Sequence, residues 1–137
     1  ANRLLSQYGT SEYATMAHFA LAKTLVAAKN YEKAQHHLQQ VIGSAGDSPL
    51  VYVARKRLAT VQLQMTKFDE ALKTLAIEFP EQFNASVEEL KGDLYALQGK
   101  KSEAVNAYRK AQKSQPGPAN ATFLQQKLDD LGMGSAE

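Results

Sequence analysis

Three short segments of the chain repeat one pattern at a nearly constant spacing. Each ends in alanine, and they are Tyr31-Glu32-Lys33-Ala34, Phe68-Asp69-Glu70-Ala71 and Lys101-Ser102-Glu103-Ala104. The three alanines are separated by 37 and then 33 residues. A period of this length indicates stacked helical hairpins, because one hairpin cannot bury its apolar face alone.

Small residues at fixed offsets predict where the two helices of each hairpin approach. Antiparallel helices come close only where neither carries a bulky side chain. The expected crossings pair Ala22 with Ala34, Ala59 with Ala71, and Gly92 with Ala104. A larger residue follows four positions after each alanine, and these are Leu38, Leu75 and Tyr108. We expect them to fill the space toward the next hairpin.

This pattern resembles the tetratricopeptide repeat, whose period is about 34 residues. The third segment matches best, at Gly92, Tyr95, Gly99, Ala104, Tyr108, Ala111 and Pro116. The first two segments depart from it, since His18 and Arg55 stand where the family often has Trp, and Gln62 where it has Tyr. The resemblance predicts an all-α, right-handed α-solenoid of three helical hairpins, in preference to an irregular helical bundle.

Proline, glycine and capping residues divide the chain. We expect the end of a leading helix in 1–10, repeats in 11–47, 48–80 and 81–117, a capping helix in 118–131 and a flexible tail in 132–137. Ser48 before Pro49 is typical of a helix N-cap, and Ser86 with Glu89 predicts a capping box. In the last helix Leu124, Leu128 and Leu131 are expected to face inward, and the polar residues from Gln125 to Asp130 outward.

The spacing of the reactive side chains argues against an enzyme, a metal site or a cofactor. The chain has no cysteine. His36 and His37 are neighbours and would point about 100° apart on a helix, while His18 lies on a different helix. The adjacent carboxylates, Glu88-Glu89 and Asp129-Asp130, diverge in the same way, so no acid/base pair is expected.

The charge balance argues against nucleic acid as a partner. Sixteen Lys and Arg face fourteen Asp and Glu, for a net charge of +2. Acidic residues are interleaved with the basic clusters, and no aromatic stacking platform accompanies them. A solvated helix face explains these clusters better.

The first helix of each hairpin is expected to line a concave, partner-binding groove. The residues on that face are Met16, Phe19, Lys23, Val26, Lys56, Arg57, Thr60, Gln64, Glu89 and Asp93. The groove would hold a peptide through an apolar anchor near Phe19, with charges that set its register. In the alternative, Phe19 and Met16 are buried against the leading helix.

Beyond the generic repeat, the chain resembles the YfgM family, whose members are ancillary subunits of the bacterial SecYEG translocon. The matching residues are Arg57-Leu58-Ala59, Val61-Gln62, Gln64, Asp69, Ala71-Leu72-Lys73-Thr74-Leu75, Gly92, Gly99, Ala104, Ala107, Lys113-Ser114, Lys127-Leu128 and Leu131. The resemblance implies a periplasmic repeat domain and an N-terminal inner-membrane helix upstream of it. It also implies that the domain receives secreted proteins together with a prolyl-isomerase-type periplasmic chaperone, and it supplies no catalytic residues.

The sequence therefore predicts a non-catalytic protein-binding module at the periplasmic side of the translocon. The alternative is a structural subunit whose repeats hold an oligomer or another envelope complex together. A monomer whose state does not change with concentration would favour the binding module.

Overall fold

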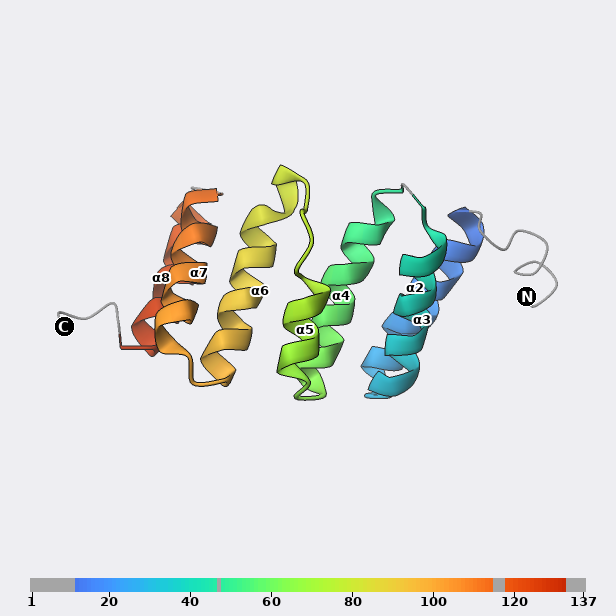
Figure 1. Ribbon diagram of the computed structural model, residues 1–137, viewed down its shortest axis with the longest axis horizontal. Coiled ribbons are helices and arrows are strands. Elements are labelled where there is room, and N and C mark those ends of the chain that lie inside the picture. The colour runs from blue at the N-terminus through green and yellow to red at the C-terminus, as the bar shows by residue number, and fades with distance from the viewer. Residues whose placement is uncertain (1–11, 47, 115–117, 133–137) are drawn as a thin grey trace. The chain divides into compact units, whose positions relative to one another are not determined.

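A computed structural model describes residues 12–46, 48–114 and 118–132 (Figure 1). The α-helices are α2 (Glu12–Ala27), α3 (Tyr31–Ser44), α4 (Leu50–Gln64), α5 (Phe68–Thr74), α6 (Asn84–Leu97), α7 (Lys101–Ser114) and α8 (Pro118–Asp130), and a short 3-10 helix η1 (Glu81–Phe83) precedes α6. The described ranges contain no strand, and the all-α prediction is confirmed. The predicted leading helix and residues 133–137 of the predicted tail lie outside the described residues.

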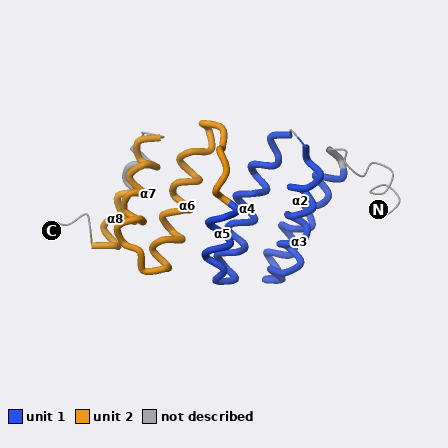
Figure 2. Tube along the Cα trace, viewed as in Figure 1, with its two compact units in different colours: residues 1–74 blue, residues 75–137 orange. Residues whose placement is uncertain are grey.

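The chain divides into two compact units (Figure 2). In unit 1, which ends at Thr74, α3 packs against both α2 and α4, and α5 packs against α4. In unit 2, which begins at Leu75, α7 packs against both α6 and α8. The division between the units lies inside the predicted repeat 48–80 and does not follow a predicted repeat boundary. The repeat boundaries expected from the sequence stay a prediction.

The three hairpin turns share one backbone geometry. The second residue after each first helix has a positive φ, and these residues are Lys29 (60°), Thr66 (59°) and Gly99 (77°). The N–H of the next residue then bonds to a carbonyl five positions back, at 2.7 to 2.8 Å. This left-handed ending satisfies carbonyl groups that the helix leaves open. Only Gly99 adopts this conformation without a steric cost.

In unit 1 the small residues are buried where the sequence predicts close helix contacts. The core cluster consists of Phe19, Ala22, Ala34, Leu38, Val41, Ala54, Leu58 and Val61. In the second hairpin, Ala59 and Ala71 are also fully buried. The alanines leave room for the larger apolar side chains between the helices.

In unit 2 the predicted crossing residues are also enclosed, since Ala104 is fully buried and Gly92 is buried within α6. A Cβ at Gly92 would lie 2.5 Å from the ring of Tyr108. The glycine therefore makes room for the Tyr108 ring within the hairpin. Tyr108 belongs to a core cluster with Leu124 and Leu128 of α8, whose inward positions are confirmed.

One of the two predicted caps is present. The Ser48 hydroxyl accepts a hydrogen bond from the N–H of Leu50 at 3.2 Å, as expected for an N-cap before proline. The predicted capping box at Ser86 is wrong. Because η1 leads directly into α6, Ser86 lies inside the first turn and its hydroxyl donates to the carbonyl of Phe83 at 3.1 Å.

Candidate partner-binding groove

Two adjoining hollows run between α2 and α4 of unit 1. The first, of about 320 Å³, is lined by Met16, Phe19, Ala20, Lys23, Leu50, Val53 and Arg57. The second, of about 250 Å³, is lined by Ala22, Lys23, Val26, Leu38, Arg57, Thr60 and Val61. Lys23 and Arg57 are common to both sets, so two cations stand where the hollows meet. We call the two hollows together the unit 1 groove.

Six of the predicted groove residues line the unit 1 groove. They are Met16, Phe19, Lys23, Val26, Arg57 and Thr60. Lys56 and Gln64 are on the same helix α4 but are absent from both linings. Gln64 is the last residue of α4 and is exposed, so it lies beyond the second hollow.

Phe19 combines a core position with a place at the groove wall. The ring is only 8% exposed and belongs to the unit 1 core. The guanidinium carbon of Arg57 lies 5.1 Å from the centroid of this ring. A cation over an aromatic face is attracted by the ring quadrupole. The Phe19 ring therefore helps to hold the Arg57 guanidinium in place. This burial differs from the apolar anchor expected at Phe19, because a side chain so enclosed offers little surface to a partner.

Glu89 and Asp93, the predicted acidic part of the groove, lie on α6 of unit 2 and are engaged by α8. The ammonium of Lys127 donates to Glu89 at 2.7 Å and to Asp93 at 2.9 Å. The Tyr108 hydroxyl also donates to Asp93. The expected outward position of Lys127 is therefore wrong, because its flexible side chain reaches from α8 to the two carboxylates on α6.

The pKa values in unit 2 follow from this network. Burial raises the pKa of the Tyr108 hydroxyl well above its ordinary value, and the hydrogen bond to Asp93 raises it further. Burial by itself would lower the pKa of Lys127, but the hydrogen bonds to Glu89 and Asp93 outweigh it and the pKa is raised. The lysine therefore stays charged, and its single positive charge is shared between the two carboxylates.

A pair of histidines joins α2 to α3 in unit 1. The Nδ1 atoms of His18 and His37 lie 3.0 Å apart, so one ring donates and the other accepts. Burial lowers the pKa of His37, and the neighbouring charges of His18 and His36 lower it further. In the described part of the chain no three His, Cys, Asp or Glu side chains gather as metal ligands would. Helix placement alone did not indicate that His18 and His37 would meet.

Two residues of α4 in the first hollow, Leu50 and Val53, were not predicted. Leu50 and Val53 line it opposite Met16 and Phe19. Their signal is the spacing Leu50, Val53, Arg57, since residues three or four apart share one face of a helix.

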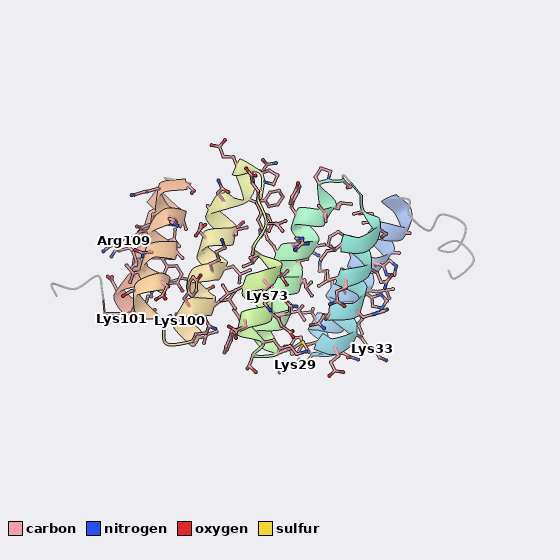
Figure 3. The ribbon with its side chains drawn as sticks, in the orientation of Figure 1. Lys29, Lys33, Lys73, Lys100, Lys101 and Arg109 are labelled. Atoms are coloured by element: carbon pink, nitrogen blue, oxygen red, sulfur yellow. The ribbon has the colours of Figure 1, made fainter. Side chains whose placement is uncertain are left out.

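The basic residues of unit 2 do not form one patch. Lys100 and Lys101 lie at the turn between α6 and α7, whereas Arg109 lies further along α7 (Figure 3). Charges spread along a helix in this way give a solvated surface.

Comparison with known proteins agrees with this architecture. The family model described as tetratricopeptide repeat-like domain matches residues 1–133. The chain belongs to the tetratricopeptide repeat-like family. Folds of this family serve protein interaction, and the chain is accordingly an interaction module rather than an enzyme.

Similar proteins within this family are named as translocon components. The chain is 35% identical over 131 residues to the ancillary SecYEG translocon subunit of Neisseria gonorrhoeae, covering 95% of the chain and 63% of that relative. It is 35% identical over 121 residues to the protein of the same name in Escherichia coli, covering 88% of the chain and 59% of the relative. The chain thus spans about three fifths of the relatives it matches. These names agree with the resemblance to the YfgM family.

Among the described helices, none has the length and hydrophobicity required to cross a membrane.

Proposed function

We propose that this tetratricopeptide repeat-like chain is the protein-binding domain of a translocon-associated protein on the periplasmic side of the bacterial inner membrane. The names of its relatives support the translocon as the setting. Because the chain spans about three fifths of those relatives, this role is proposed for the larger protein to which the domain corresponds.

The unit 1 groove is the observation that carries the proposal. Its two ends present apolar side chains to solvent, since Met16 is 58% exposed and Val26 is 37% exposed. Exposed apolar side chains that line a hollow are typical of a protein-interaction site. The cations Lys23 and Arg57 add polar contacts at its centre.

The proposed partners are proteins that leave the translocon and a periplasmic chaperone of the prolyl-isomerase type. The resemblance to the YfgM family supports this pairing, as it supports an inner-membrane helix upstream of the domain. In this role the groove would hold apolar stretches of an unfolded chain until the chaperone receives them.

A structural role is the second candidate. Leu21 and Leu97 are 43% and 57% exposed, and neither lines the unit 1 groove. Such side chains would be covered in an oligomer or a larger complex. Analytical ultracentrifugation over a wide concentration range distinguishes the two roles, since the binding module is expected to sediment as a monomer throughout.

Site-specific photocrosslinking in the bacterial envelope tests the proposed function. A photoreactive residue at Lys23 of the full protein should capture translocon subunits or a periplasmic chaperone. The matched control is the same residue at Lys33, which is exposed on α3 and lines neither hollow. Equal capture from both positions, or capture only of another copy of the protein, would exclude the groove as the contact.

A further inference from the structure

We infer that the unit 1 groove binds an extended protein segment in which one acidic side chain lies between two apolar side chains. This inference rests on the proposed function and names the class of segment that the groove accepts. It follows from the order of the lining residues along α2 and α4, with apolar ends and a cationic centre.

The two ends of the groove are suited to apolar side chains. The first hollow is walled by aliphatic and aromatic residues from both helices, and the second has Leu38 of α3 among its lining residues. Their volumes of about 320 and 250 Å³ accommodate one large aliphatic side chain each. Burial of such a side chain removes apolar surface from water and favours binding.

The centre of the groove is suited to a carboxylate. Arg57 is held above the Phe19 ring, and Lys23 lines the same two hollows from α2. Within the described ranges no acidic side chain forms an ion pair with Lys23 or Arg57. The two cations therefore complement a negative charge from a partner, and a guanidinium binds a carboxylate through two parallel hydrogen bonds.

The length of the groove fixes the spacing of the ligand. Met16 and Val26 are ten residues apart on α2, which is about 15 Å at 1.5 Å per residue. In an extended chain, side chains one, three and five face the same way and span about 13 Å. The matching pattern is apolar, any residue, Asp or Glu, any residue, apolar.

The same geometry selects a side-chain carboxylate over the carboxylate of a chain end. A hollow lies on each side of the Lys23 and Arg57 pair. A ligand that fills both must continue past its negative charge in both directions. A C-terminal carboxylate would leave the second hollow empty.

Fluorescence polarisation with a capped peptide tests the inference on the whole 137-residue chain. The probe is acetyl-Ser-Leu-Ser-Glu-Ser-Leu-Ser-amide with a dye on an added N-terminal linker. Replacing its Glu by Gln should weaken binding about tenfold, the effect of about 1.4 kcal/mol on a charge pair. A peptide that ends at the Glu with a free carboxylate should also bind about tenfold more weakly, because it fills one hollow only.

Variants of the protein assign the effect to the cations. Arg57→Gln and, separately, Lys23→Gln should each weaken binding of the Glu peptide and leave binding of the Gln peptide unchanged. Lys33→Gln is the matched control and should change neither. Both Lys23 and Arg57 are exposed, and thermal melts confirm that each variant is folded.

Three results would overturn the inference. They are equal affinity for the Glu and Gln peptides, equal affinity for the peptide with the free carboxylate, and binding that appears only after residues 1–11 are deleted. The last would identify the chain's own leading segment as the occupant. Peptide specificity combined with failed crosslinking in the envelope would reject the translocon role and keep the recognition pattern, so the two failures are distinguishable.

Discussion

Helices α2 and α4 of unit 1 and helix α6 of unit 2 are the first helices of their hairpins, but their charged residues have different surroundings. In unit 1, Lys23 and Arg57 line two largely apolar hollows, and Arg57 lies over the Phe19 ring, which carries no negative charge. In unit 2, Glu89 and Asp93 both form ion pairs with Lys127. A charged helix face is available to a partner only where the chain's own side chains leave its charges unpaired.

The largest expected effect concerns Phe19, the buried ring beneath the unit 1 groove. Phe19→Ala should destabilise the protein by about 3 to 5 kcal/mol, the usual loss for truncation of a buried aromatic ring. Urea unfolding measures the loss. Met16→Ala, in the same hollow but 58% exposed, serves as the control and should change stability by less than about 0.5 kcal/mol. If both variants lose similarly little stability, Phe19 is not a core residue, and the prediction that it is a groove anchor would stand.

The tight contact in unit 2 gives the second prediction. Gly92→Ala brings a Cβ to 2.5 Å from the Tyr108 ring. The ring must shift and its hydroxyl must leave Asp93, so we expect a loss of about 1 to 3 kcal/mol, despite the gain in helix propensity. Gly43→Ala is the matched control, because this helical glycine has no atom within 4 Å of a new Cβ. It should gain about 0.5 to 1 kcal/mol, and a gain at both positions would contradict the close approach.

Much of the fold could be predicted from these small residues. Their spacing predicts helical hairpins and buried alanines, because a close helix crossing depends on side-chain volume and periodicity, which are properties of the sequence. The contact between Gly92 and the Tyr108 ring was not predicted, because the repeat spacing gives positions along the helices and not the direction in which a large side chain packs.

The charges of the site were harder to predict. Lys127 was placed outward with its polar neighbours, yet a long flexible side chain can turn back along a helix toward carboxylates on another helix. The direction of a lysine depends on charges that meet only in the folded chain. Helix-face periodicity therefore identified six residues of the unit 1 groove and could not show that Glu89 and Asp93 are already paired.

The third prediction concerns Lys127, which pairs with Glu89 and Asp93 in unit 2. Lys127→Met keeps the length of the side chain and leaves Glu89 and Asp93 without their cation. We expect a loss of about 1 kcal/mol, because the three groups are hydrogen-bonded but about a quarter to a third of each side chain is exposed. Urea unfolding at low and high salt measures it, and the difference from the wild type should shrink in high salt.

Lys113→Met, at an exposed position of α7, is the control for that substitution. If Lys127→Met and Lys113→Met have the same stability, the ion pairs of Lys127 with Glu89 and Asp93 do not stabilise unit 2. Glu89 and Asp93 would then be as available to a partner as the cations of unit 1.

The smallest expected effect is that of acidification, which should destabilise unit 1 more than unit 2. All three histidines belong to unit 1. The pKa of folded His37 is lowered from 6.5 by burial and by the charges of His18 and His36. As the pH falls through 6.5, the unfolded chain therefore takes up a proton that the folded chain resists, and the free energy of unfolding decreases. The decrease should level off below the folded pKa, and above pH 7 the stability should be independent of this group.

Amide hydrogen exchange at pH 7.5 and 5.5, corrected for the intrinsic rate, locates this effect. Helices α2 and α3 should lose protection on acidification, and α6 and α7 should lose less, because no histidine lies in unit 2. His37→Gln should abolish most of the difference between the units. His36→Gln removes an exposed ring and should keep most of it. If His37→Gln leaves the difference intact, the pH sensitivity of unit 1 must come from its other titratable groups.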